Sequence, residues 1–327
     1  MAHLTNPLAT PDQLYNRNSL SSLPQDVQEA VFIATQCLTQ AAGLLLDLPQ
    51  SVTAQANVIL ARYWLVESPM AHEFSVRDPH VSWQALRHPE IQTNKKQHAS
   101  AASIFIVSKM GPIPRSPRDI SNVYGYLLSQ DSALFKTESS ATNNPKSYYQ
   151  SESDYYAFHN HVLAIEPRIL YALSFDTHVS LPHPLAITYL QTLDFLAQPK
   201  KRIAEQVIHH LNTALLSPQL LYLTHQPNAL ATAAIYAAAR DVGAKMPECA
   251  WWEVFDVDRE ELGFLVVALR SLEGWIRTRR QEMPWMGDGV VTRKIVVSEL
   301  KKRGLQVGNG DQVVDEEQAV MDMLDNR

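Results

Sequence analysis

Two segments of this chain share the pattern of one small-residue helix, and they constrain the fold more than any other feature. Residues 97–109 and residues 227–240 both consist largely of Ala with Ser or Thr, interspersed with a few large apolar side chains. Small side chains on several faces let neighbouring helices approach closely, so such a helix belongs at the centre of a bundle. Because the pattern occurs twice, we expect two copies of one helical domain. This favours a scaffold that presents a surface over an enzyme.

The bulk composition supports two domains. The chain has 327 residues, of which 46% are hydrophobic, and this is enough material for two cores. Charged residues make up 19%, a low fraction that suggests a partner covering part of the surface. The formal net charge of -6 gives no broad electrostatic basis for direct nucleic-acid binding.

Cysteine usage and the N-terminal segment bear on the compartment. Cys37 and Cys249 are the two cysteines, and such a low count fits a reducing environment. The first residues are too polar for a signal peptide, and no apolar run is long enough to predict a membrane span. We therefore expect a protein of the cytoplasm or nucleus that does not bind a membrane.

The first predicted domain covers residues 24–177. The N-terminal residues 1–23 before it are expected to be a flexible tail or a strap that has no core of its own. A helix begins near Pro24 and ends at Pro49, and a second one runs to about Val66. The small-residue helix follows, and Ser116 with Pro117 then starts a fourth helix as cap and first residue. A fifth helical pattern covers residues 154–173 and is interrupted by Pro167. Polar insertions are expected at about residues 67–95 and 131–151.

The second predicted domain covers residues 178–281 and repeats the order of five helices. These helices are expected at about residues 183–197, 201–216, 227–242, 251–256 and 258–280. A C-terminal tail at 282–327 carries basic residues and then an acidic end. No segment alternates with a period of two over any length, so strands are not expected. The predicted fold is all-α, with two tandem five-helix domains and flexible N- and C-terminal tails.

No residue pattern predicts catalysis, a cofactor or a metal. His159 and His161 are two residues apart, and His209 and His210 are adjacent, whereas a helix presents metal ligands on one face at i and i+4. No phosphate-binding loop, paired Cys motif or zinc-protease motif occurs. A pair of tryptophans at 251–252 is either a binding platform or, as we favour, a plug at the end of the second bundle.

Beyond the arrangement of helices, several motifs resemble the cyclin family, and within it the L-type cyclins. Residues 40–50 (QAAGLLLDLPQ) followed by residues 58–64 (VILARYW) are similar to the first and second helices of that group. Ser108 and Lys109, followed by residues 114–123 (PRSPRDISNV), are similar to its junction between the third and fourth helices. The motifs EPRILYALSFD at 166–176, LPHP at 181–184 and YLQTL at 189–193 resemble the fifth helix and the entry to a second cyclin box. The resemblance covers about residues 24–281.

The resemblance implies a nuclear regulatory subunit of a cyclin-dependent kinase that acts in transcription and pre-mRNA splicing, without catalysis of its own. Cyclins bind the kinase backbone around its αC helix with two side chains, a Lys at the end of the third helix and a Glu in the fifth helix. Lys109 and Glu166 match these positions. We expect apolar or aromatic residues near this pair to belong to the kinase-binding surface as well, and the candidates are Phe105, Ile113, Tyr124 and Phe158. Without a partner, Lys109 would be a cation at a helix C-terminus and Glu166 a solvated residue near a kink.

The chain departs from the family pattern at several positions. Met110 and Gly111 stand where acidic residues usually follow the Lys, Pro167 follows the Glu, and the insertion at 67–95 is longer than usual. The Arg-Ser-rich tail of animal L-type cyclins and the substrate-docking motif of cell-cycle cyclins are both absent. Splicing or RNA polymerase II factors remain candidate partners beside the kinase.

Two other functions compete with the kinase-binding one. The first is a non-kinase adaptor of the TFIIB type, which clamps DNA and polymerase with two cyclin boxes. That function needs a basic surface and usually a zinc ribbon, and neither is evident in the sequence. The second is a helical enzyme with a site between the two domains, which is disfavoured because no nucleophile or ligand constellation appears.

Overall fold

The computed structural model describes residues 5–20, 23–68, 98–129, 132, 148–196, 201–286 and 290–305. Most residues of the two insertions predicted at about 67–95 and 131–151 lie outside the described ranges. The acidic end beyond residue 305 lies outside them as well. All regular structure in these ranges is helical, and none of it is a strand, which agrees with the predicted fold class. No helix in them is long and apolar enough to cross a membrane.

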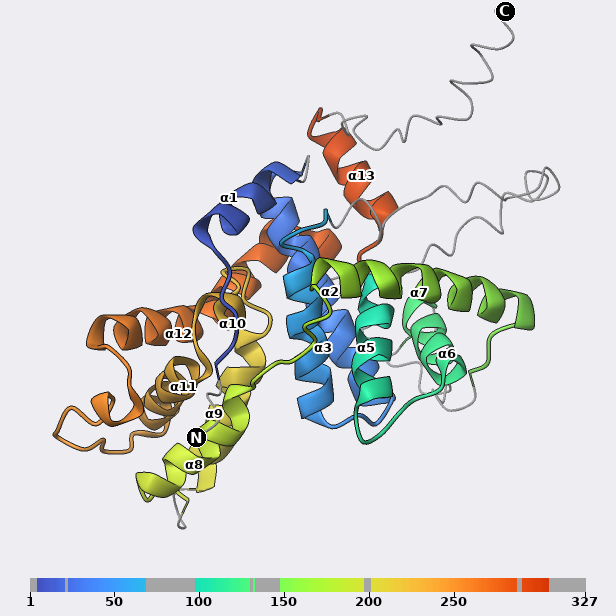
Figure 1. The fold of residues 1–327 in the computed structure, drawn as a ribbon. Coiled ribbons are helices and arrows are strands. Elements are labelled where there is room, and N and C mark those ends of the chain that lie inside the picture. The colour runs from blue at the N-terminus through green and yellow to red at the C-terminus, as the bar shows by residue number, and fades with distance from the viewer. Residues whose placement is uncertain are drawn as a thin grey trace, which may run out of the picture.

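The first repeat is a bundle built around its small-residue helix (Figure 1). Its helices are α2 (Gln25–Leu45), α3 (Gln50–Tyr63), α5 (His98–Met110), α6 (Pro117–Leu128) and α7 (Glu152–Ala172). Helix α5 packs against the other four. The side chains of Ala99, Ser100, Ala102 and Ser103 are fully buried, which lets these neighbours approach the α5 backbone closely. The central position predicted for this helix is confirmed.

The second repeat places its own small-residue helix at the centre. Its elements are α8 (Pro182–Thr192), α9 (Lys201–Ala214), α10 (Leu221–Thr224), α11 (Pro227–Val242), the 3-10 turn η4 (Glu253–Phe255) and α12 (Arg259–Glu282). Helix α11 packs against α8, α9 and α12. The boundary predicted at residues 177–178 falls in the linker between α7 and α8, and the buried apolar residues of both repeats form one continuous cluster.

The helix predicted at residues 251–256 is only the single turn η4. Asp256 adopts a left-handed conformation with φ of 56°, which ends the turn. Its carbonyl and that of Phe255 accept hydrogen bonds from the side chain of Asn228, at 2.9 and 3.1 Å. The preceding Trp251 is buried and stacks on Tyr236 with ring centroids 6.3 Å apart. Trp251 is thus part of the core of the second repeat, which favours the plug over the binding platform for this residue, whereas Trp252 is only partly buried.

The described part of the N-terminal segment is a strap, one of the two alternatives that we expected, and not a flexible tail. Helix α1 (Pro11–Leu20) follows an extended stretch that is held by Asn6. The Asn6 side chain donates to the carbonyl of Ser180 and accepts from its N–H, both at 2.8 Å. Arg17 lies over the ring of Phe32 in the first repeat and donates to Pro218 O in the second. The strap has no core of its own, as predicted, because its partners lie in both repeats.

The C-terminal segment also departs from the predicted tail. The described residues 284–286 and 290–305 include the turn η5 (Pro284–Met286) and the helix α13 (Arg293–Lys302). A small separate core joins α13 to the start of α2, and its buried residues are Leu23, Val27, Val31, Val291, Val296 and Leu300. Arg303 adds ion pairs to Asp26 at 2.6 Å and to Glu299 at 3.0 Å. Helix α13 was not predicted, because its apolar residues pack against the start of α2, about 270 positions earlier in the chain.

This terminal contact predicts an acid-sensitive contribution to stability. Burial raises the pKa of Asp26, but hydrogen bonding to Arg303 and its charge outweigh this and hold the pKa below the ordinary value of 3.8. A carboxyl with a lowered pKa stabilises the fold above its unfolded pKa, and this stabilisation is lost as the pH falls through the folded pKa. We expect Arg303→Ala to reduce the free energy of unfolding by about 0.5 kcal/mol near pH 6, and by progressively less as the pH falls through the folded pKa of Asp26.

Urea unfolding at several pH values measures this effect. Lys302→Ala serves as the control, because Lys302 is exposed on the same helix. A loss in Arg303→Ala that is equal at every pH would contradict the role assigned to the Asp26 carboxylate.

Candidate functional site

Packing of α5 against α7 brings Lys109 and Glu166 together, although they lie 57 residues apart in sequence. The Lys109 ammonium donates a hydrogen bond to the Glu166 carboxylate and forms an ion pair with it. The side chain of Lys109 is 49% exposed, whereas that of Glu166 is 10% exposed. Lys109 also lies over the ring of Phe105, 5.1 Å from its centroid. The Lys109 side chain is therefore partly exposed to solvent, while its ammonium contacts the Glu166 carboxylate and the face of the Phe105 ring.

The fifth helix runs through Pro167 without a break, contrary to the interruption that we predicted. Helix α7 is continuous from Glu152 to Ala172, and Ser151 caps its start by accepting from the N–H of Asp154. Pro167 lies on the exposed side of the helix. Its missing N–H leaves the carbonyl of Leu163 without a helical donor, and at an exposed position water can satisfy that acceptor. The helix thus keeps Glu166 on its packed face and places a free backbone acceptor one turn earlier.

Exposed apolar side chains are carried by the same elements as this ion pair. Among them are Met110 at the end of α5 and Leu163 and Tyr171 on α7, with Ile113 in the loop after α5 and Phe175 in the linker after α7. Tyr171 and Phe175 contact each other edge to face, with centroids 5.3 Å apart. Large apolar residues at the surface of a small domain indicate an interaction surface when they gather beside fixed polar groups.

Two of the four neighbouring residues predicted for the surface are in the core, which corrects that part of the prediction. Tyr124 is 0% exposed and Phe158 is 2% exposed, and their rings lie 6.2 Å apart. The Tyr124 hydroxyl and the Ser100 hydroxyl share a hydrogen bond of 2.6 Å. These two side chains support α5 and α7 from inside. The helical spacing of Tyr124 with Ile120 and Leu127 was a signal for this burial.

The remaining predicted residues do reach the surface. Ile113 is exposed and Phe105 is half-buried beneath Lys109. Four other exposed residues of this surface were not predicted from the sequence: Met110, Leu163, Tyr171 and Phe175. The available signal was that Leu163 and Tyr171 lie off the face of α7 that carries the buried Val162, Ile165 and Ile169.

The linker between the repeats is fixed beside the end of α5 by two side chains of α3. Arg62 donates to the carbonyl of His178 at 2.9 Å, and Gln55 donates to that of Thr177 at 3.0 Å. Burial lowers the pKa of the Arg62 guanidinium, while the charge of Asp176 raises it. The Thr177 hydroxyl in turn contacts Met110 Sδ at 3.7 Å. These contacts set the position of the linker relative to the exposed end of α5.

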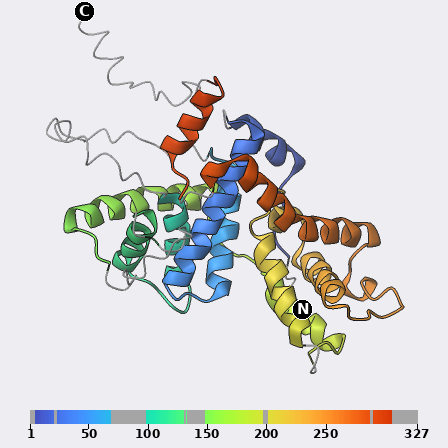
Figure 2. The ribbon, with the colours of Figure 1, turned by 180° about the vertical axis from the view of Figure 1, so that it is seen from behind.

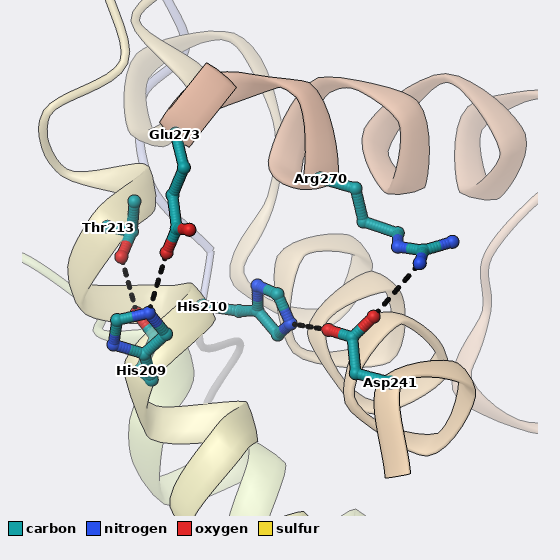
Figure 3. Close-up of polar contacts among 6 residues, drawn as sticks. All are labelled: His209, His210, Thr213, Asp241, Arg270 and Glu273. Atoms are coloured by element: carbon teal, nitrogen blue, oxygen red, sulfur yellow. Dashed lines mark hydrogen bonds and ion pairs between the residues drawn. The ribbon is translucent and has the colours of Figure 1, made fainter. Parts of the chain in front are cut away.

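The histidines of the second repeat form polar contacts between helices (Figure 3). His209 on α9 is bonded to Glu273 on α12 at 2.8 Å, and His210 is bonded to Asp241 at 2.7 Å. Asp241 also pairs with Arg270 at 3.0 Å. No group of three His, Cys, Asp or Glu residues in the described ranges could hold a metal ion.

Comparisons with known proteins find relatives by sequence and by fold. No model of a protein family matches the chain. An uncharacterised cyclin-L1-like protein of Schizosaccharomyces pombe is 30% identical over 71% of this chain and 78% of its own length. Human Cyclin-L2 is 27% identical over 95% of this chain and 53% of its own length, so the chain spans about half of that relative. A chain in the crystal structure of the yeast RNA polymerase II CTD kinase CTDK-1 complex superposes with a TM-score of 0.58 and 14% identity, covering 93% of this chain and 85% of its own.

Proposed function

The chain belongs to the cyclin family, in its L-like group, and we propose that it is the regulatory subunit that binds and activates a cyclin-dependent kinase. The observation that carries this proposal is the pair of Lys109 and Glu166 at the exposed end of α5. A Lys offers donors to backbone carbonyls and a carboxylate accepts from backbone N–H groups. Together they can hold both kinds of group at the end of a partner helix.

Activation by such a subunit is a shift of the kinase between two conformations. A kinase needs the Glu of its αC helix in contact with its ATP-binding Lys, and this requires αC to be held inward. A surface that binds only the inward position raises the population of the active state. The exposed Met110, Ile113 and Leu163 would supply the apolar contact area, and Lys109 with Glu166 would fix the orientation of αC. In this proposal the chain itself carries out no catalytic step.

We further propose that the kinase acts in the nucleus, in transcription and pre-mRNA splicing. The support for this is the L-like membership and the fold shared with a chain of an RNA polymerase II CTD kinase complex. Splicing or polymerase factors would then be further partners of the heterodimer. Direct nucleic-acid binding is not part of the proposal, because the formal net charge is -6.

Affinity purification of the tagged full chain from its own cells tests the proposal. Mass spectrometry of the eluate should find a cyclin-dependent kinase in stoichiometric amount. The purified kinase alone should be nearly inactive towards a polymerase-tail peptide, and adding the chain should raise its activity. An eluate with polymerase or splicing subunits but no kinase would contradict the proposal and indicate a non-kinase adaptor.

A further inference from the structure

A cleft of about 460 Å³ lies between the two repeats, on elements other than those that carry Lys109 and Glu166. Figure 2 shows the C-terminal half of α12 reaching from the second repeat to the side of α2. The cleft is lined by Cys37 from α2, Thr213 from α9, Leu216 from the turn after α9, and Glu273, Ile276, Arg277, Arg280 and Gln281 from α12. Both repeats therefore contribute to its wall, and a molecule bound there would contact both.

Two guanidinium groups of this cleft form no ion pair within the part of the chain that the structure describes. Arg277 and Arg280 are exposed, lie three residues apart on one face of α12, and form no hydrogen bond or ion pair with any described residue. Glu273, four residues before Arg277, would ordinarily pair with it along the helix. In this structure the Glu273 carboxylate instead accepts from His209 at 2.8 Å (Figure 3). Glu273 also lines the cleft, so its lining carries the two positive groups Arg277 and Arg280 against one negative group, and the net charge of the lining is positive.

Four residues that line the cleft carry no charge, and we call them its floor: Cys37, Thr213, Leu216 and Ile276. Leu216 and Ile276 supply aliphatic surface. Burial raises the pKa of the Cys37 thiol and outweighs the opposite effect of Arg280, so the thiol stays protonated at neutral pH. The hydroxyl of Thr213 is used within α9, where it donates to the carbonyl of His209 at 2.9 Å. A ligand of this cleft therefore needs negative charge towards α12 and an apolar group towards the floor.

We propose that this cleft docks a phosphorylated peptide segment of a partner protein. A phosphoserine or phosphothreonine would lie between Arg277 and Arg280, with an apolar neighbour against Leu216 and Ile276. A phosphate carries close to two negative charges and three acceptor oxygens, which match two adjacent guanidinium groups, each with five donors. A single carboxylate has one charge and would leave one arginine unpaired. The macrodipole of α12 favours cations near its C-terminus, but it does not account for an apolar cleft beside them.

The proposal adds a second surface to the chain and does not depend on the contact with a kinase. A regulatory subunit with this site would hold partners that already carry a phosphate, while Lys109 and Glu166 hold the kinase. The two surfaces use different helices, so substitutions in one should leave the other intact.

Binding of the full chain to an oriented library of peptides with a central phosphoserine tests the proposal. Peptides enriched from the library are then labelled with a fluorophore, and their affinity is measured by fluorescence polarisation. We expect removal of the phosphate to weaken binding by about tenfold or more, since two charge-assisted contacts are lost. The double variant Arg277→Gln/Arg280→Gln should weaken binding of the phosphorylated peptide by a similar factor. Raising the ionic strength should weaken it as well.

Two further variants separate the proposal from non-specific attraction. Arg277→Lys/Arg280→Lys keeps both charges but loses the planar fork, so it should fall between the wild type and the Gln variant. Arg259→Gln removes an exposed charge at the other end of α12 and should bind as the wild type does. Equal binding of the unphosphorylated peptide or of its Glu analogue, or a Gln variant that binds normally, would overturn the proposal. Circular dichroism confirms that each variant is folded.

Discussion

Lys109→Glu is expected to abolish stable association with the kinase, lowering the affinity by about 100-fold or more. The substitution removes the donors that would hold backbone carbonyls of the kinase. It also places a second carboxylate beside Glu166, whose side chain is 10% exposed. Isothermal titration of the purified kinase with the variant measures the affinity. A dissociation constant within about twofold of the wild type would remove Lys109 from the binding surface.

The same substitution should cost some stability, and a second variant separates this from binding. Because Lys109 is half exposed, we expect a loss of about 1–2 kcal/mol in the free energy of unfolding. The exchanged pair Lys109→Glu/Glu166→Lys restores the attraction between α5 and α7 and should recover most of that stability. It should not recover kinase binding, because the donor and the acceptor have changed places. Recovery of both would mean that the ion pair only holds α5 against α7.

Lys245→Glu is the matched control for the charge reversal. Lys245 pairs with Glu248 at 2.8 Å, but both side chains are more than four-fifths exposed. Such a surface pair contributes little to stability. The variant should therefore bind the kinase and unfold as the wild type does.

Enlarging one alanine in each central helix should destabilise the protein by several kcal/mol. Ala102 on α5 and Ala234 on α11 are both 0% exposed, and each helix is packed by neighbours on several sides. The added atoms of Ala→Leu have no free volume there, so each substitution should cost about 1–3 kcal/mol. The two sites lie in different repeats, so the double variant should lose about 2–6 kcal/mol. Urea unfolding followed by circular dichroism measures these losses.

Exposed alanines of α7 provide the matched comparison. Ala157 and Ala164 are exposed on this helix. Leu is nearly as good a helix former as Ala, so Ala157→Leu and Ala164→Leu should change stability by less than about 0.5 kcal/mol. If the core and surface variants were equally stable, α5 and α11 could not be the tightly packed centres of the two repeats.

Local sequence patterns were sufficient for most of the helical order. The apolar spacing in residues 25–45 and 259–282 and the capping Ser116 placed their helices within a few residues of the observed bounds. The pattern failed at residues 251–256, where a side chain from α11 ends the turn. It also failed for the strap, because the partners of Asn6 lie 174 and 220 residues away and leave no periodic signal.

The candidate site was predicted only in part. Lys109 and Glu166 came from a resemblance, and the structure shows them in contact. Tyr124 and Phe158 were assigned to the surface by proximity along the chain, whereas their side chains point into the bundle. The charge of the cleft could not be predicted at all. Whether Arg277 is paired depends on Glu273, and Glu273 is bonded to a histidine 64 residues earlier.

The sequence by itself determined that this protein is two helical repeats, each built around a helix of small residues. That information is local, because a run of Ala and Ser within one helix suffices to state which helix the others can approach. Only the tertiary structure decided which polar groups are satisfied and which are left free. Pairing energies depend on distances between side chains of different helices, and those distances exist only once α5 lies on α7 and α12 lies on α9. Both candidate binding surfaces depend on this packing, which holds Glu166 against Lys109 and Glu273 against His209.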